Sequence, residues 1–583
     1  LGNLASAEAV AALIRLLRGG SSVSIRRAAA ASLAQIGTPK AAQALVEALS
    51  NPQIRNIAAA NIRVLGKAAV PSAVERLDET RVPPGEAETL VTLLGEIGDR
   101  RASKVLIAEL DRQRVDAEKV ITALKICGDS SALIPLLRRF GKAKNDSFRL
   151  KILDALEPII DGRAEKPLMK RLDTKNVPIR TRIVRLLGRL KTGRAVPKIL
   201  TFLKSPEKPL RLASIRALGL IGDPRAEKAL APLLASIDDG VRMEAADAMG
   251  RAAAPESARR LMKELNNNTE WTTKARAAHM KAIGTLLRRK PHAHTLKALV
   301  DWARPPPHDL SMPALEALQA TRSKGVAPLL VKLYNSNKTS KAKQIKIIEI
   351  LGDSKHPKAL PLLLQALRQR KDVSLSATAA WALRKYGDPR ALPHLLRRWG
   401  RARHPAVQIN ITAAISVMGK ERQGAAFLRK QLTHRNLYVR LNALLGLSSV
   451  VGKKGRKSFF RAAADVGAKA AHNSYLARHT VRLLKKMRAP KSSIARAKSS
   501  ITMDVSRGRK AKWRHLHKRS KLDWIAFQLT DRDGKPSSRK PFVLILGDGT
   551  TRAGFAGPLG RAREEGIPVG SCYLEMPRTW PKP

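Results

Sequence analysis

The sequence predicts a mostly α-helical protein, a right-handed α-α superhelix of repeated helix pairs, followed by a small C-terminal antiparallel β-sandwich. Glycines recur about every 30 residues through most of the chain, and such a period is typical of a solenoid. After residue 521 the helical pattern gives way to short β-rich runs separated by Asp-Gly turns. A chain of 583 residues exceeds what one hydrophobic core usually serves, which also favours an array whose units pack on their neighbours.

The stretch from 223 to 250 shows how one repeat is built. Asp223 can cap a helix whose first turn holds Pro224, and Asp238–Gly240 is expected to separate the two helices of the unit. Gly250 is expected to end the second helix. Neither helix can bury its apolar stripe alone, so stacking of units has to cover both stripes. The stripes are Leu230, Leu233 and Leu234 in the first helix and Val241, Ala245, Ala248 and Met249 in the second.

The same pattern recurs as GTPKAAQALVEAL at 37–49, GDSKHPKALPLLL at 352–364 and GDPRALPHLL at 387–396. It predicts about fifteen units between Ala5 and Met487. The pattern resembles the HEAT and phycobilisome-lyase-like repeat families of bacteria over about five-sixths of the chain. The resemblance implies a solenoid, whereas nothing beyond the repeat pattern supports pigment chemistry. The glycines expected where helix pairs end are Gly37, Gly66, Gly98, Gly128, Gly188, Gly222, Gly352, Gly387, Gly419 and Gly452.

An arginine follows an apolar residue near the start of the second helix in many units, and from Arg149 to Arg242 the step is 31 residues. Residues that occupy the same position in successive repeats of a solenoid lie on one line along its surface. In HEAT families this arginine typically bonds an aspartate of the preceding turn, a role open here to Asp238 or Asp239. A structural ladder and a set of cations facing an anion both stay open as interpretations. The members are Arg26, Arg55, Arg149, Arg180, Arg211, Arg242 and Arg440, and the turns before Arg26, Arg55 and Arg440 carry no acid.

The chain carries 110 Lys and Arg against 47 Asp and Glu, a formal net charge of +63. Such a field attracts anions over a Debye length of about 8–10 Å. Residues 1–130 hold 17 basic and 14 acidic side chains, a net of +3, whereas residues 420–521 hold 28 and 3, a net of +25. Charge that served solubility alone would be spread evenly, so its concentration at one end predicts a binding site for a polyanion.

Nucleic acid, most simply the backbone of DNA, is the expected partner, since Lys and Arg contact phosphates without reading sequence. Few aromatic residues lie between the basic ones, and no zinc-finger, helix-turn-helix or RNA-recognition motif is present. Duplex DNA or structured RNA is therefore favoured over single strands, with an acidic protein surface as the competitor. The candidate contact residues are Lys453, Lys454, Arg456, Lys457, Arg461, Arg482, Lys485, Lys486, Arg507, Arg509, Lys510, Lys512, Arg514, Lys518 and Arg519.

The C-terminal region is expected to form strands at Trp524–Leu529, Phe542–Leu546 and Cys572–Met576, with a hairpin at Asp548–Gly549. It resembles a transthyretin-like, or carboxypeptidase-regulatory-like, module of bacterial type VI secretion and phage-tail-associated proteins. The matching residues are Asp531, Asp533, Gly534, Pro536, Gly547–Thr550, Gly560–Ala562, Gly566–Pro568, Gly570 and Cys572. These are turn and core residues, so the resemblance implies a module that docks another protein, a bacterial origin and a secretion or contractile-tail context.

No catalytic constellation stands out, and no enzyme activity, metal or cofactor is expected. His515 and His517 have no acidic or thiol partner nearby, and His292 and His294 lie at a Pro-rich break. Some HEAT-like solenoids are alkylpurine DNA glycosylases that use Trp and Asp, and the acid-Trp neighbours here are Glu270–Trp271 and Asp301–Trp302. Core packing is the simpler role for both tryptophans. Cys127 and Cys572 are too few for a disulfide framework or a cysteine zinc site.

The predicted domains are a solenoid over residues 1–488, a basic linker over 489–521 and the β-module over 522–583, with few core contacts across the linker. The favoured function is a non-enzymatic scaffold whose basic C-terminal half binds nucleic acid. The alternatives are a type VI secretion or contractile-tail adaptor or effector that binds an acidic protein, and a HEAT-type glycosylase. No run of 18 apolar residues suggests a membrane span, so a bacterial cytoplasmic protein, or one exported by a contractile system, is expected.

Overall fold

The computed structural model describes residues 7–304, 310–336, 339–452, 455–469, 474–497, 524–529, 540–546, 548–557, 561–565 and 572–575. The chain divides into two compact units, Leu1–Ala254 and Pro255–Pro583. About 75% of it is helical, and the predicted solenoid of helix pairs is confirmed. Among the described residues, no helix is both long enough and apolar enough to cross a membrane.

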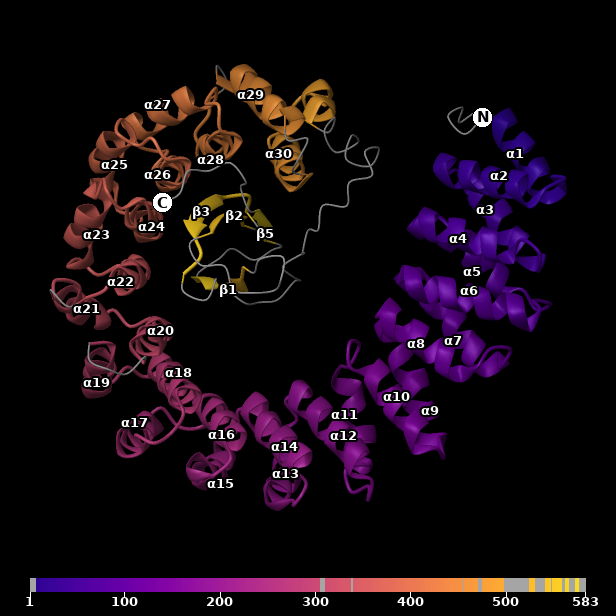
Figure 1. Ribbon diagram of the computed structural model, residues 1–583, viewed down its shortest axis with the longest axis horizontal. Helices are drawn as coiled ribbons and strands as arrows, with labels where there is room; N and C mark the ends of the chain where they lie inside the picture. Colours follow the sequence, from indigo (N-terminus) through magenta and orange to yellow (C-terminus); the bar gives the residue numbers. More distant parts are fainter. Residues whose placement is uncertain are drawn as a thin grey trace. The chain divides into compact units, whose positions relative to one another are not determined.

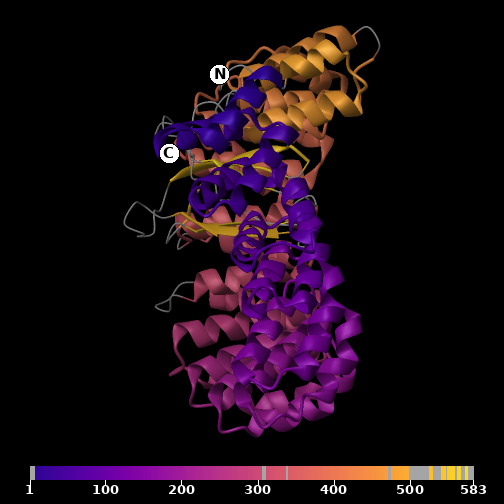
Figure 2. The same ribbon diagram turned by 90° about the vertical axis from the view of Figure 1, so that its right-hand side faces the viewer.

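The first unit is a row of helix pairs, shown from indigo to magenta in Figure 2. Its α-helices are α1 (Ala7–Gly19), α2 (Val23–Ile36), α3 (Pro39–Glu47), α4 (Arg55–Leu65), α5 (Val70–Asp78), α6 (Pro84–Ile97), α7 (Ser103–Arg112), α8 (Ala117–Cys127), α9 (Leu133–Lys142), α10 (Asp146–Leu156), α11 (Glu165–Lys170), α12 (Val177–Leu190), α13 (Val196–Thr201), α14 (Lys208–Ile221), α15 (Glu227–Leu230) and α16 (Asp239–Ala252). Short 3-10 helices join them: η1 (Ala48–Ser50), η2 (Gly66–Ala68), η3 (Arg100–Ala102), η4 (Ser130–Ala132), η5 (Gly162–Ala164), η6 (Gly193–Ala195), η7 (Phe202–Lys204), η8 (Pro224–Ala226) and η9 (Ala231–Ala235).

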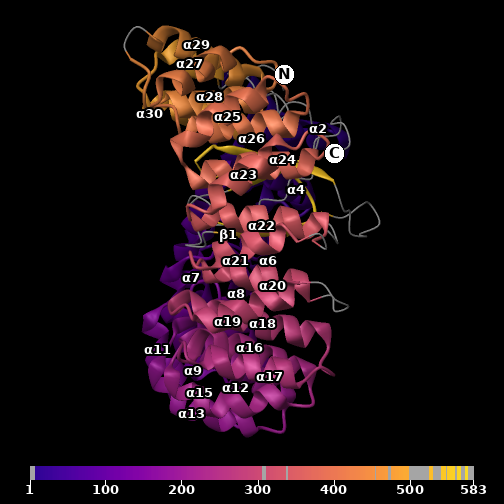
Figure 3. The same ribbon diagram turned by 90° about the vertical axis from the view of Figure 1, so that its left-hand side faces the viewer.

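The second unit continues the pattern and then adds the strands (Figure 3). Its helices are α17 (Ser257–Asn267), α18 (Thr273–Arg289), α19 (Ala293–Ala303), α20 (Ser311–Thr321), α21 (Val326–Tyr334), α22 (Lys341–Ser354), α23 (Ala359–Arg368), α24 (Val373–Tyr386), η10 (Pro389–Ala391), α25 (Leu392–Trp399), α26 (Pro405–Ser416), α27 (Arg422–Gln431), α28 (Leu437–Leu447), α29 (Arg456–Lys469) and α30 (Ser474–Lys486). Its strands are β1 (Trp524–Gln528), β2 (Pro541–Ile545), β3 (Thr551–Phe555), β4 (Arg561–Glu565) and β5 (Tyr573–Glu575).

Within each unit, an odd-numbered helix packs against the even-numbered helix that follows, and successive even-numbered helices pack side by side. The local signals act as expected at Asp223, whose side chain accepts the N–H of Arg225 at 2.9 Å while Pro224 fills the first turn of η8. Asp238 likewise caps α16. Sequence-local capping therefore sets where the helices begin.

Three of the glycines expected to end helices lie inside helices instead. Gly188, Gly250 and Gly352 belong to α12, α16 and α22, so their assignment as helix ends is wrong. A Cβ on Gly188 would lie 2.7 Å from the Cα of Ala217, in the next even-numbered helix. Close approach of neighbouring helices explains this glycine, whereas Gly222 does end its helix, with a φ of +74°.

The strands form two antiparallel sheets, β1–β4 and β3–β2–β5. The expected hairpin is confirmed: β2 pairs with β3 around Asp548–Gly549, and Gly549 has a φ of +88°. Strands β3 and β4 were not predicted. Arg561–Glu565 is almost entirely charged and Thr551–Phe555 contains Gly554, so neither has the alternating apolar pattern of a strand.

Strand β3 packs on the solenoid of the second unit, against α24, α26 and α28 (Figure 1). Trp381 of α24 and Ala413 of α26 share one buried core with module residues, namely Leu529, Phe542, Leu544, Leu546, Ala556 and Cys572. The expectation of few core contacts across the linker is therefore wrong. The reason is that the module is too small to cover both faces of its sheets and completes its core with a tryptophan of the solenoid.

The helical part continues beyond α30. Residues 491–497, which the sequence assigned to the linker 489–521, are helical. Ala497 is fully buried, and a Cβ on Gly467 of α29 would lie 2.7 Å from its Cα. The remainder of the predicted linker, 498–521, lies outside the described residues.

Candidate polyanion-binding surface

The basic candidates that the structure describes lie on one helix pair, α29 and α30, which pack against each other. On α30 the apolar residues Leu476 and Leu484 are buried, while Arg482 and Lys485 are exposed, so the charges lie on the outer face of an amphipathic helix. All six described candidates are exposed: Arg456, Lys457 and Arg461 on α29, and Arg482, Lys485 and Lys486 on α30. Lys453, Lys454 and the seven cations from Arg507 to Arg519 lie outside the described residues.

Acidic residues are scarce around this helix pair. Residues 420–497 contain two acids, Glu421 and Asp465. Asp465 forms ion pairs with Arg440, with Lys469 at 3.3 Å and with Arg496 at 3.6 Å. Burial alone would raise the pKa of Asp465, but the hydrogen bonds and charges of Arg440 and Lys469 together outweigh burial and lower it. Within the described ranges, none of the six exposed cations of α29 and α30 forms an ion pair with a carboxylate.

In the first unit, several exposed cations form ion pairs with carboxylates of neighbouring helices. Several ion pairs there join successive even-numbered helices. Arg189 of α12, for example, lies 3.0 Å from Glu157 just beyond α10. The other pairs are Arg63–Glu96, Lys119–Glu88, Lys151–Glu118, Arg182–Asp154 and Arg216–Glu244. The six exposed cations of α29 and α30 therefore differ from these residues, because they have no carboxylate partner among the described residues.

The arginines of the expected ladder share one contact that the sequence did not reveal. Six of them donate to the backbone carbonyl oxygen six residues earlier, at the end of the first helix of their own unit. Arg26 donates to Gly20 at 2.8 Å, Arg55 to Leu49 at 2.7 Å and Arg149 to Ala143 at 2.9 Å. Arg180, Arg211 and Arg242 donate in the same way to Thr174, Ser205 and Ser236. A guanidinium at this place satisfies carbonyls that a helix end leaves open.

Acidic partners are secondary in this ladder. Arg242 also contacts Asp239, as expected, and Arg149 contacts Asp146 at 2.8 Å. Arg440, which has no acid in its preceding turn, pairs with Asp465 of α29 instead. That partner lies 25 residues later in sequence, beyond the reach of any argument from the local turn.

A second set of arginines was missed, although its signal, Asp-x-Arg-Ala, is visible in the sequence. Arg101, Arg163, Arg225 and Arg390 each bond the aspartate two residues earlier. Arg101 also donates to the carbonyl oxygen of Lys67 in the preceding unit at 2.9 Å, and Arg163 and Arg225 make the equivalent contact with Ser130 and Gly193. The side-chain hydrogen bond from Arg101 lowers the pKa of Asp99 to about 2. Arg101, Arg163 and Arg225 therefore connect neighbouring repeats.

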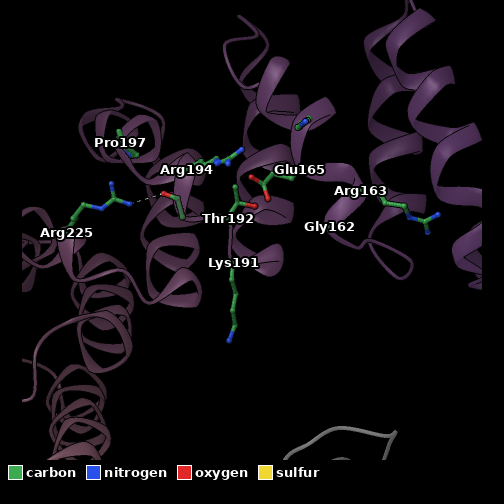
Figure 4. Close-up of a pocket in the computed structure, with 10 residues that line it drawn as sticks. Gly162, Arg163, Glu165, Lys191, Thr192, Arg194, Pro197 and Arg225 are labelled. Atoms are coloured by element: carbon green, nitrogen blue, oxygen red, sulfur yellow. Dashed lines mark hydrogen bonds between the residues drawn. The ribbon is translucent and has the colours of Figure 1, made fainter.

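The first unit contains a cavity of about 790 Å³ at such a connection (Figure 4). It is lined by Gly162, Arg163, Glu165, Lys166, Lys191, Thr192, Gly193, Arg194, Pro197 and Arg225. Figure 4 shows Arg194 and Glu165 extending toward one another, and Arg225 bonded to the carbonyl of Gly193. Arg163 pairs with Asp161 and Arg225 pairs with Asp223. The cavity is therefore part of the contact between neighbouring repeats of the first unit.

The residues considered for catalysis make structural contacts. Trp271 is buried, with its ring centroid 4.6 Å from that of His279. Trp302 donates Nε1–H to Asn266 at 3.1 Å, and the guanidinium of Arg276 lies 4.8 Å from its ring. His292 contacts Arg259. Among the residues with described positions, no group of three or more His, Cys, Asp or Glu could hold a metal; His515 and His517 lie outside that range.

The family model for HEAT repeats matches residues 1–66, 165–250, 196–280 and 336–416. The solved Kap95:Nup1 complex is 11% identical, with 86% of this chain and 84% of that chain covered and a TM-score of 0.49. Yeast importin-beta (Kap95p) is 12% identical with coverages of 86% and 84% and a TM-score of 0.47. Kap121p is 13% identical with coverages of 85% and 67% and a TM-score of 0.46. No curated protein matches the chain by sequence.

Proposed function

We propose that this chain, a HEAT-repeat solenoid, is a non-enzymatic scaffold that binds a nucleic-acid backbone, in the first instance duplex DNA. The observation that carries the proposal is the set of six exposed cations on α29 and α30, which have no carboxylate partner among the described residues. In the first unit, by contrast, several cations of the even-numbered helices pair with a carboxylate of a neighbouring helix. Unpaired exposed charge is available to an external anion.

Phosphate contacts explain why this charge needs no fixed geometry. Each Lys or Arg that meets a phosphate releases a condensed counterion, so affinity accumulates from many separate contacts. Lys453 and Lys454 come before α29 in the sequence, separated from its first residue by Gly455, and Arg507 to Arg519 come after it. All of them belong to a stretch with a net charge of +25 over residues 420–521. Such contacts position a protein on DNA without reading bases.

The ladder arginines have a structural role in this proposal. Their guanidinium groups are occupied by carbonyl oxygens within their own units, as at Arg26 and Arg55. Their replacement should therefore lower stability and leave affinity for DNA almost unchanged.

The test is a binding assay of the full chain against two unrelated DNA duplexes over a range of salt concentrations. Log K should fall linearly with log salt, with a slope of about −0.9 for each phosphate neutralised, and should differ little between the duplexes. Replacing Lys453, Lys454, Arg456 and Lys457 together by Gln should weaken binding and make the slope shallower by a few units. A slope near zero, or discrimination between the duplexes of about 4 kcal/mol or more, would contradict the proposal.

The matched control removes four charges from the first unit. Lys40, Lys104, Lys125 and Lys144 are exposed, and their joint replacement by Gln gives the same net charge as the test variant. If both variants lose affinity equally, net charge rather than the surface on α29 and α30 drives binding. Parallel titrations with single-stranded DNA, RNA and an acidic polypeptide identify the class of polyanion, and tightest binding to the polypeptide would favour the adaptor alternative.

The resemblance of the C-terminal module to transthyretin-like domains stays a prediction. A transthyretin-like identity for residues 522–583, and the bacterial secretion or contractile-tail context that it implies, would add a second partner at the β-module. Strand β5 is the edge of the three-stranded sheet opposite β3, so it is the edge to which such a partner would add.

A further inference from the structure

Two asparagines of the solenoid hold the backbone of the edge strand β3. Asn410 of α26 accepts from the N–H of Ala553 and donates to its carbonyl oxygen, both at 2.8 Å. Asn442 of α28 makes the same pair of bonds with Thr551, at 2.9 Å and 3.1 Å. Both asparagine side chains are completely buried. Two neighbouring repeats of the solenoid thus bind alternate residues of one extended strand.

The asparagines are oriented by the solenoid itself. Nδ2 of Asn410 also donates to the carbonyl oxygen of Ala377 at 2.8 Å, and Nδ2 of Asn442 donates to that of Ile409 at 3.1 Å. Each contact reaches the preceding even-numbered helix, α24 or α26, and holds the amide group toward β3. A site that is arranged before its ligand arrives loses less conformational entropy on binding.

The residue between the two bonded positions is recognised by its side chain. Arg552 is only 7% exposed and lies 3.1 Å from Glu349 of α22. Its guanidinium is 5.6 Å from the ring centroid of Trp381 on α24. A carboxylate together with an aromatic face is a favourable site for arginine. Acidic recognition of this kind is unusual in a chain with a net charge of +63.

We propose that Glu349, Trp381, Asn410 and Asn442 form a strand-binding surface for an extended polypeptide segment that carries an arginine. Strand β3 is its tethered occupant, and a segment of the same chemistry can replace it. The asparagines bind main-chain groups that every peptide possesses, so they provide affinity, while Glu349 and Trp381 provide the preference for arginine. An acidic side chain in place of Arg552 would face Glu349 and be rejected.

The test uses a fluorescent peptide with the sequence of residues 549–557, GTTRAGFAG, and the full chain. The variant Arg552→Glu places a carboxylate of β3 opposite Glu349 and so weakens the tethered occupant. The peptide should bind this variant at least tenfold more tightly than it binds the wild-type chain. A peptide with Gln in place of Arg should bind at least tenfold more weakly, and adding Asn410→Ala and Asn442→Ala should remove binding. Equal affinity of the two peptides, or no binding to the Arg552→Glu chain, would overturn the proposal.

A second measurement avoids any variant that fails to fold. Hydrogen exchange of the wild-type chain should show faster exchange at the amides of Thr551 and Ala553 when excess peptide is present, because the tethered strand is displaced. The Gln peptide at the same concentration is the control and should leave both amides protected. Unchanged protection with the arginine peptide in large excess would mean that β3 is a permanent part of the core. Neither the peptide affinity nor the hydrogen exchange depends on nucleic-acid binding. A negative result in these experiments would therefore leave the proposed function untouched, and the reverse also holds.

Discussion

Arg552 of β3 and Glu349 of α22 form an ion pair of 3.1 Å between residues 203 positions apart in sequence. Lys346 also reaches Glu349, at 3.4 Å. Burial alone would raise the pKa of Glu349, but the charges of Lys346, Arg552 and Lys385, with a hydrogen bond from Lys346, together outweigh burial and lower it. This contact belongs to the same interface as the core around Trp381. The β-module and the helices of the second unit should therefore unfold together.

The first prediction concerns this pair. Replacing Arg552 by Ala should lower the free energy of unfolding of the second unit by about 3 kcal/mol, because removing one partner leaves a buried charge less well compensated. The measurement is a urea titration followed by circular dichroism. Arg390→Ala is the control, since Arg390 pairs with Asp388 at the surface with its side chain 73% exposed and should cost less than about 1 kcal/mol. Equal effects of the two changes would show that the interface contributes little.

The second prediction separates ladder arginines from surface arginines within one helix. Arg180 and Arg185 both lie in α12, but Arg180 donates to the carbonyl of Thr174 and lies 5.2 Å from the ring of Phe202, whereas Arg185 is exposed. Arg180→Gln should destabilise the first unit by about 1.5–3 kcal/mol, and Arg185→Gln by less than about 0.5 kcal/mol. Thermal melts compare the variants. Duplex affinity should not change with Arg180→Gln, and its loss in a folded protein would place the ladder in the binding site.

The third prediction tests the close approach of neighbouring helices. Gly188→Ala should destabilise the first unit by about 1–3 kcal/mol, because the new Cβ would lie 2.7 Å from the Cα of Ala217. Gly141 near the end of α9 has no atom within 4 Å of the same position. Gly141→Ala should therefore stabilise by about 0.5–1 kcal/mol through helix propensity alone. A stabilising effect of Gly188→Ala in the same denaturation experiment would contradict the packing argument.

The fourth prediction concerns pH. His479 of α30 is 8% exposed and lies against Gly549 of the module. Burial, with the charge of Arg482, lowers the pKa of His479 from 6.5 to about 4, while Asp548 acts in the opposite direction. The unfolded chain therefore binds a proton more readily than the folded one. The contribution of His479 is complete above about pH 6.5 and is lost as the pH falls toward 4, by about 3 kcal/mol in all.

The measurement for this prediction is the free energy of unfolding between pH 7.5 and 4 for the wild-type chain and for His479→Gln. Carboxylates with lowered pKa values, such as Asp465, affect both proteins alike and cancel in the difference. The wild-type chain should lose more stability than the variant across this range. Parallel curves would show that His479 is not buried at the module in solution.

Much of the solenoid could be predicted because its signals are local. Apolar residues at helical spacing and caps such as Asp223 are properties of short stretches, and the 31-residue step from Arg149 to Arg242 is likewise visible in the sequence. The contacts of the ladder could not be predicted. Its acceptors are backbone carbonyls, as for Arg211 and Ser205, and every residue has one. Gly188 and Gly222 received the same role from their spacing, although one is a packing glycine and the other ends a helix. The Asp223–Pro224 pair that follows Gly222 is the local signal that separates the two.

The sequence by itself determined the helix pairs, their period and the concentration of basic charge toward one end, since propensity, patterning and composition act within one repeat. Only the tertiary structure decided that the module is bound by its own solenoid. Asn410, Asn442 and Glu349 each look ordinary in sequence, and their role depends on β3 being brought beside them from more than 100 residues away. Long-range contacts of this kind are selected by the shape and burial of the assembled surfaces, which no local pattern records.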